Sequence, residues 1–242
     1  MYKRQRFTLS RAFGRAGWRT VGDIPSNDRD WPEGRSFYDY DRVYDRRDVD
    51  YQGPAFSYAS MPDQYTLAAF QKLELAPGHD PVMAEIDLVS SHTPWTPLPR
   101  MVPWDQVGDG SVFDRMPAQG LAPDVAWAHA DTVRRLYGES IQYSLRALVS
   151  WVAQLHDENL VLVLLGDHQP SAKISGADAN HRVPVSFVAS DPEVLDLIAS
   201  WQWQDGLLPA PDAPVWRMDA FRDRFLDAFS APTGAAALRQ PR

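Results

Sequence analysis

The hydrophobic pattern of the chain is strongest at residues 160–165, six consecutive leucine and valine residues that read LVLVLL. An apolar run with no polar residue on either face is typical of a strand buried on both faces, as in the middle of a parallel sheet. Gly166 interrupts the run, and Pro170 lacks the N–H group that a hydrogen-bonded ladder needs. We therefore expect a central strand at residues 160–165 that leaves the sheet before Pro170.

Shorter patterns on both sides of this strand predict further elements. Strands are expected at 18–24, 81–89 and 183–189, and helices at 6–17, 60–76, 124–154, 191–201 and 216–229. The long helix between the strands at 81–89 and 160–165 is a crossover connection, which predicts that these two strands are parallel. The alternation of helices and strands predicts an α/β fold. Residues 25–60 and 96–123 lack a clear period and are expected to be irregular.

The helix expected at residues 60–76 has a recognisable start. Ser60 can act as the N-cap, Pro62 falls in the first turn, and Asp63 completes a sequence that resembles a capping box. Asp63 is therefore assigned to capping and not to ligand binding.

Asp167 and His168 directly follow Gly166 at the end of the central strand. In open α/β sheets, ligands bind beyond the carboxyl ends of the strands. A carboxylate oxygen and an imidazole nitrogen together suit a divalent metal such as Zn²⁺ or Mn²⁺. The alternative is that Asp167 caps the next turn and that His168 is an ordinary hydrogen-bonded side chain.

His92 holds the corresponding position after the strand expected at 81–89, with Ser90, Ser91 and Thr93 beside it. Hydroxyl and imidazole donors gathered at a strand end could hold a tetrahedral oxyanion. The alternative is an ordinary polar loop.

The bulk composition narrows the possible functions. The 242 residues, 44% of them hydrophobic, are enough for one α/β domain, which we place at residues 1–230 with a flexible tail at 231–242. A net charge of −8 argues against a general nucleic-acid binder. The absence of cysteine excludes disulfides and thiolate metal sites. No run approaches the ~20 apolar residues of a membrane span, and no apolar region follows the basic residues 1–6 as in a signal peptide.

Two motifs carry a resemblance to a known family. The apolar strand followed by GDHQP at residues 166–170 resembles the late metal-binding motif of the alkaline phosphatase superfamily. The likeness is greatest to its sulfatase-like branch, which includes lipoteichoic acid synthases and related membrane-anchored bacterial enzymes. The segment SSHTPW at residues 90–95 resembles the S-x-H-x-P-aromatic segment of that branch. The order and separation of the two motifs agree with the family, and the resemblance covers about residues 7–229.

The resemblance implies a three-layer α/β/α fold and the metal-dependent hydrolysis or transfer of phosphate or sulfate esters. Asp167 and His168 would hold one divalent metal ion, which could be Mn²⁺, Mg²⁺, Zn²⁺ or Ca²⁺. His92 would bind the substrate oxyanion or protonate the leaving oxygen.

Further residues are implied as substrate contacts. Trp31 would line the pocket for the substrate headgroup, which could belong to a lipid or a polymer, and its arginine partner is open between Arg29 and Arg35. His181 is suggested by its position alone: it lies just before the strand expected at 183–189 and could reach the site as an anion or metal contact. The alternatives are a packed tryptophan in a solvated loop and a polar residue at a strand start.

The chain departs from the family at its N-terminal end. The branch places a Thr or Ser nucleophile and an acidic metal ligand before the helix–strand unit that opens this chain, whereas Thr8 and Ser10 fall inside the first expected helix. The chain therefore resembles the C-terminal part of such an enzyme, with a sheet that is incomplete at its N-terminal side. The parent enzyme would lie at the extracytoplasmic face of the bacterial membrane, anchored by the missing N-terminal half. The alternative is a non-catalytic ligand-binding remnant of the fold.

Overall fold

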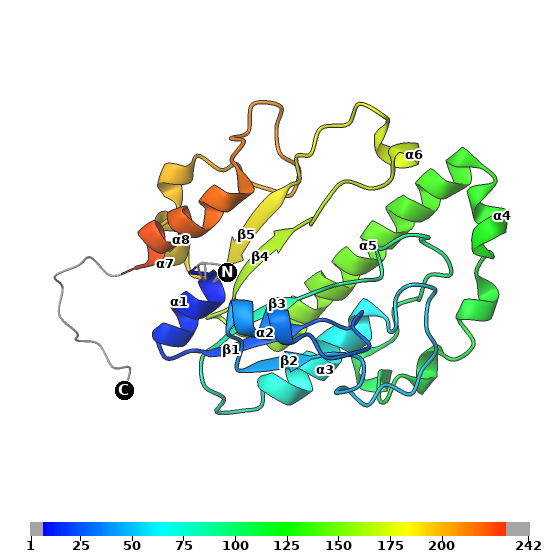
Figure 1. Ribbon diagram of the computed structural model, residues 1–242, viewed down its shortest axis with the longest axis horizontal. Helices are drawn as coiled ribbons and strands as arrows, with labels where there is room; N and C mark the ends of the chain where they lie inside the picture. The colour runs from blue at the N-terminus through cyan, green and yellow to red at the C-terminus, as the bar shows by residue number, and fades with distance from the viewer. Residues whose placement is uncertain (1–6, 231–242) are drawn as a thin grey trace. The chain divides into compact units, whose positions relative to one another are not determined.

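The computed structural model describes residues 7–230, which fold as two compact units (Figure 1). The first unit comprises residues 7–156 and Pro170–Ala179, and the second comprises Asp157–Gln169 and residues 180–230. The predicted tail at 231–242 lies outside the described residues, and a single domain over residues 1–230 stays a prediction. No helix within residues 7–230 is long and apolar enough to cross a membrane.

The first unit contains a parallel sheet and the helices that pack on it. Its elements are α1 (Leu9–Arg15), β1 (Arg19–Asp23), α2 (Pro32–Tyr38), β2 (Arg42–Tyr44), α3 (Asp63–Glu74), β3 (Val82–Ile86), α4 (Pro123–Trp127), α5 (Ala130–Leu155) and α6 (Ala172–Ser175). The helices predicted at 6–17 and 60–76 and the strands predicted at 18–24 and 81–89 are confirmed as α1, α3, β1 and β3.

Two local predictions for this unit are wrong. The stretch 25–60 is not wholly irregular, because it contains α2 and β2. Both elements are too short to produce a hydrophobic period, although Pro32 in the first turn of α2 is a start signal that the sequence offered. The single helix expected at 124–154 is interrupted at Ala128 and His129, which separate α4 from α5.

The three strands are parallel, in the order β2-β1-β3, so that β1 lies between its two neighbours (Figure 1). Val21 pairs with Arg42 on one side and with Ala84 on the other. Because all three strands run in the same direction, their carboxyl ends meet at one edge of the sheet.

Alternate residues of β1 face opposite layers. On one face, Thr20 lies against Gly14 of α1, and the ring of Tyr40, just after α2, covers Gly22 so closely that a Cβ atom there would lie 3.0 Å from it. These contacts place α1 and the end of α2 on one face of the sheet.

The other face of β1 is covered by α3. Arg19 donates two hydrogen bonds to Glu74 of α3, at 2.5 and 2.7 Å, and the Tyr44 hydroxyl donates to the same carboxylate at 2.6 Å. Val21 is fully buried on this face. The expected α/β fold is therefore confirmed, with three layers in the first unit.

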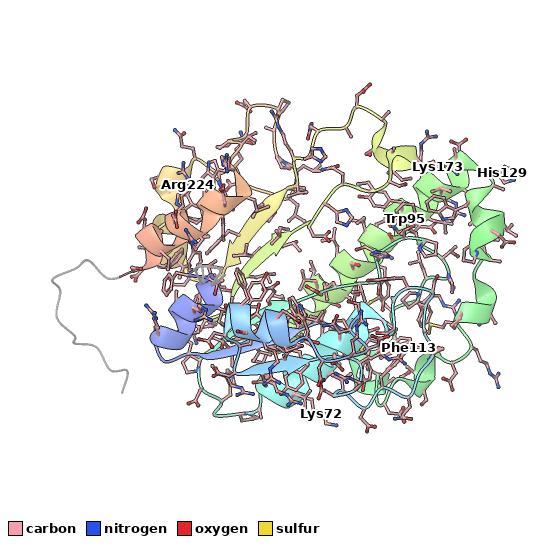
Figure 2. All side chains as sticks on the ribbon, in the orientation of Figure 1. Lys72, Trp95, Phe113, His129, Lys173 and Arg224 are labelled. Atoms are coloured by element: carbon pink, nitrogen blue, oxygen red, sulfur yellow. The ribbon has the colours of Figure 1, made fainter. Side chains whose placement is uncertain are left out.

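Helix α5 closes the core of the first unit by packing on α3. The Trp151 ring lies edge-on to Phe70 with centroids 6.2 Å apart, and its indole N–H donates to Gln71 at 3.1 Å. Near the other end of α5, a cluster forms around Trp95, which stacks on Trp127 at 5.4 Å (Figure 2).

The second unit contains a separate sheet with short helices. Its elements are β4 (Val161–Leu165), β5 (Val185–Ala189), α7 (Pro192–Asp196), two 3-10 turns (Ala199–Trp201 and Met218–Ala220) and α8 (Phe221–Phe229). Phe187 of β5 packs on Trp201 and on Phe229, and Arg224 of α8 lies over the Trp216 ring (Figure 2). The sequence predicted both strands and the two helical regions.

The role assigned to the strand at 160–165 is wrong. Among the described residues β4 pairs with β5 alone, and the pair is antiparallel, with Val163 opposite Phe187. Val161 and Leu165 are 41% and 47% exposed, so β4 is not the twice-covered central strand of a parallel sheet. The strand at 81–89, which was expected to run parallel to this strand, belongs to the sheet of the first unit as β3, between whose bounds and those of β4 the chain passes from one unit to the other. A short apolar run predicts a strand, but it carries no information about the direction of its partner.

Candidate functional site

The carboxyl-terminal edge of the parallel sheet is built from acidic residues. Asp23 ends β1, Asp45 directly follows β2, and Asp87 directly follows β3. The Asp87 N–H donates to the Asp23 carbonyl at 2.9 Å, which continues the pairing of β1 and β3 to this edge. Parallel pairing therefore collects three carboxylates that are far apart in the sequence.

Asp23 is the most perturbed carboxylate of this edge. It is 2% exposed, and burial together with the negative charges of Asp87 and Asp48 raises its pKa to about 7. The carboxylate of Asp45, in contrast, accepts hydrogen bonds from Arg47, which hold its pKa below the ordinary range. Sequence reasoning missed Asp23, although an acidic residue at the end of a predicted strand was the same signal that selected Asp167.

His92 lies in the loop that follows β3, in the first unit, and its side chain is exposed. Its Nδ1 lies 2.7 Å from the Thr93 carbonyl. Since a carbonyl oxygen only accepts, Nδ1 carries the hydrogen in this contact and Nε2 remains for a ligand. The Tyr58 ring stacks on the imidazole, with centroids 3.6 Å apart and planes 20° apart.

The His92 loop is attached to the protein core through Asp63. The Ser90 N–H donates to the Asp63 carboxylate at 2.8 Å, the Asp63 N–H donates to the Ser90 hydroxyl at 3.0 Å, and the Ser144 hydroxyl of α5 donates to Asp63 at 2.5 Å. Ser90 therefore caps α3 from a different segment. Burial raises the pKa of the fully buried Asp63, and these hydrogen bonds oppose the rise.

The capping role predicted for Ser60 is wrong. The hydroxyl of Ser60 donates to the Pro25 carbonyl, and α3 begins after Pro62 without a local side-chain cap. Asp63 does lie in the first turn of α3, but its carboxylate serves the neighbouring loop instead of a capping box.

Trp31 precedes α2 and is 37% exposed in the first unit. Its ring lies over Gly34, where a Cβ atom would be 2.2 Å away, and 5.9 Å from the Tyr38 ring. Arg29 and Arg35, the two candidates for its arginine partner, are both exposed. An exposed indole whose position is set by its own helix can still contact a ligand.

Asp167 and His168 lie side by side in the second unit, both exposed. His168 Nε2 is 3.4 Å from Asp167 Oδ2, and His168 Nδ1 is 2.7 Å from the Gln169 carbonyl. His181, in the same unit, is also exposed.

The oxygen and nitrogen of Asp167 and His168 suit a divalent metal, but two ligands fall short of the three that a catalytic zinc keeps. Within residues 7–230, no three His, Cys, Asp or Glu side chains are grouped so that they could hold a metal ion. The described residues therefore do not complete a metal site.

Comparisons with known proteins found a similar solved structure but no related sequence. No family model matches the sequence, and no curated protein matches it. Among solved structures, the chain is similar to the lipoteichoic acid synthase LtaP from Listeria monocytogenes, with 19% sequence identity and a TM-score of 0.47. The match covers 75% of this chain and 45% of that protein, so the chain spans less than half the length of LtaP.

Proposed function

We propose that the chain is part of a metal-dependent hydrolase or transferase that acts on phosphate or sulfate esters, in which His92 binds the substrate oxyanion. The observation that carries the proposal is the position of the His92 side chain and the contact that its ring makes. Nδ1 contacts the Thr93 carbonyl at 2.7 Å, which leaves Nε2 for a ligand on an exposed side chain in the loop that follows the carboxyl end of β3. This is the position at which α/β sheets bind their ligands.

The two ring nitrogens of His92 would have different roles. Nδ1 faces the Thr93 carbonyl, so Nε2 is the nitrogen that would face an anionic oxygen or a leaving oxygen of the substrate. The Ser91 and Thr93 side chains flank this position in the sequence and would add hydroxyl donors. Trp31 would contribute an apolar wall for a lipid or polymer headgroup, and His181 a further anion contact.

Asp167 and His168 would supply two ligands of a single divalent metal ion, which would serve as a Lewis acid and a template. The remaining ligands and the nucleophilic hydroxyl would come from a segment outside this sequence, in a parent enzyme at the extracytoplasmic face of the membrane. On this proposal, the isolated chain orients an ester but does not form a covalent intermediate with it.

A non-catalytic, anion-binding protein is the second candidate. The observation that favours it is the incomplete metal site, since no cluster of three ligand side chains occurs within residues 7–230. Such a protein would keep the His92 anion contact without turnover.

The test measures anion binding and hydrolysis separately. We expect inorganic phosphate to bind the chain and to bind His92→Gln at least ten-fold more weakly. His79→Gln is the matched control, because His79 is exposed and makes the same Nδ1–carbonyl contact, with Asp80 at 2.7 Å, at the opposite end of β3. Equal phosphate binding by the parent and His92→Gln would refute the role of His92.

Hydrolysis distinguishes the two candidates. With Mn²⁺, Mg²⁺ or Zn²⁺ added, we expect the isolated chain to cleave chromogenic phosphate and sulfate esters little or not at all. A version extended by the upstream segment should cleave one of them several orders of magnitude faster and lose this activity in His168→Ala. An inactive extended version that still binds phosphate would favour the non-catalytic candidate.

A further inference from the structure

Tyr58 is presented to solvent by a tight turn that is closed by two buried residues, Phe56 and Ala59. Phe56 and Ala59 exchange backbone hydrogen bonds at 2.8 and 3.2 Å and are 4% and 3% exposed, whereas Tyr58 between them is 51% exposed. Ser57 adopts a left-handed conformation, with φ of 60°, that reverses the chain. Burial of Phe56 and Ala59 therefore stabilises the turn, and burial of the Tyr58 side chain does not.

The same turn is tied to the edge of the sheet where the acidic residues collect. The hydroxyl of Ser60, directly after the turn, donates to the carbonyl of Pro25, which lies two residues beyond the end of β1. Tyr58 therefore reaches His92 from a segment that is independent of the loop after β3. Because the Tyr58 turn and the His92 loop are held separately, their contact restrains reorientation of the imidazole ring even where the His92 loop by itself would allow it.

Two contacts together fix the orientation of the His92 ring. The Nδ1 contact with the Thr93 carbonyl limits rotation of the ring within its plane, and the Tyr58 stack at 3.6 Å and 20° fixes the plane itself. The phenol ring covers one face of the imidazole, so a ligand on that side meets the ring at its Nε2 edge. An oxyanion that accepts from Nε2 approaches in the plane of the ring, so this approach stays open while the stacked face is closed to other groups.

We propose that Tyr58 is a positioning residue of His92 and that its stacking contact fixes the direction in which Nε2 meets an oxyanion. The inference rests on the proposed function for the role of His92 and adds a residue from outside both sequence motifs. The aromatic ring of Tyr58 positions His92, and its hydroxyl does not, so Tyr58→Phe preserves the stacking contact.

The first measurement follows the His92 ring directly by NMR, with its resonances assigned by comparison with His92→Gln. In the parent, we expect the stacked Tyr58 ring to shift the His92 ring protons upfield. We expect Tyr58→Leu to abolish this shift and Tyr58→Phe to retain it. Trp18→Leu is the matched control, because Trp18 is another exposed aromatic residue, 40% exposed, and directly precedes β1 at the opposite edge of the sheet.

The second measurement is the dissociation constant for inorganic phosphate. A stacked aromatic pair of ordinary strength corresponds to a loss of about 2- to 12-fold, which we expect in Tyr58→Leu and not in Tyr58→Phe or Trp18→Leu. Unchanged His92 shifts in Tyr58→Leu, or a Tyr58→Phe variant that behaves like Tyr58→Leu, would overturn the inference. If the shifts follow the prediction but His92→Gln binds phosphate like the parent, the positioning role stands and the proposed function fails.

Discussion

Asp23 gives the sharpest test of the structure, because its ionisation is opposed by burial. An ordinary aspartate has a pKa of 3.8, whereas burial and the charges of Asp87 and Asp48 raise the pKa of Asp23 to about 7. The difference corresponds to about 4 kcal/mol of free energy, since each tenfold change in the proton equilibrium is worth about 1.4 kcal/mol. Asp23→Asn keeps the shape of the protonated side chain and removes the ionisation.

The sign of the effect follows from proton binding. Between about pH 4 and pH 7, Asp23 is ionised in the unfolded chain but keeps its proton in the folded one, so the free energy of unfolding falls as the pH rises through this window. Below this window the free energy of unfolding of the parent is not reduced by Asp23, and above it the reduction is complete. We therefore expect Asp23→Asn to match the parent near pH 4 and to exceed its stability by up to about 4 kcal/mol at pH 8.

The assay compares the two proteins at each pH, so that titrations common to both cancel. Amide hydrogen exchange of Val21 and Gly22 in β1 reports the stability of the first unit even if the two units unfold separately. The carboxyl carbon of Asp23, followed by NMR, gives the pKa itself. A stability difference that stays constant from pH 4 to pH 8, or a carboxyl titration near pH 4, would refute the reasoning.

Three further predictions concern single contacts. Burial would raise the pKa of Glu74, but the hydrogen bonds from Arg19 and a tyrosine hydroxyl outweigh burial and lower the pKa. Glu74→Gln should therefore lower the free energy of unfolding by about 2 kcal/mol at pH 7, and by progressively less as the pH falls through the lowered pKa. Urea unfolding across this pH range measures the difference. Ser90→Ala removes the cap of α3 and leaves the Asp63 N–H without that partner, and should cost about 1 kcal/mol in the same assay, whereas an unchanged midpoint would contradict the cap. Calorimetry should detect only weak Mn²⁺ binding, absent in His168→Ala, and tight stoichiometric binding would show that ligands have been missed.

The elements that the sequence predicted correctly are those whose signals are local. Gly17 ends α1 with a φ of 86°, and the side chain of Asp191 caps α7 by accepting from the Glu193 N–H at 2.8 Å. The end of α1 and the start of α7 each depend on residues within a few positions of one another. The apolar run that forms β4 is a local signal in the same sense. The positions of His92 and His168 after strands were likewise readable, because a strand end is marked by the residues that stop it.

Local sequence patterns do not determine which segments, distant in the sequence, come into contact. The apolar run of β4 does not encode an antiparallel partner, since hydrophobicity is the same for either direction of pairing. The start of α3 shows the same limit, because the nearby Ser60 is a plausible cap by sequence, whereas the hydroxyl that caps the helix belongs to Ser90. A residue's neighbours in space decide such contacts, and its neighbours in sequence do not.

The candidate site depends on these distant meetings. Asp63 is held by Ser90, 27 positions later, and the His92 ring is stacked by Tyr58 from a turn with no motif of its own. The pKa of Asp23 is raised by its burial and by charges that belong to other segments of the sheet edge. Burial, pairing direction and electrostatic environment are properties of surroundings assembled from many segments, and for that reason they appear only once the chain has folded.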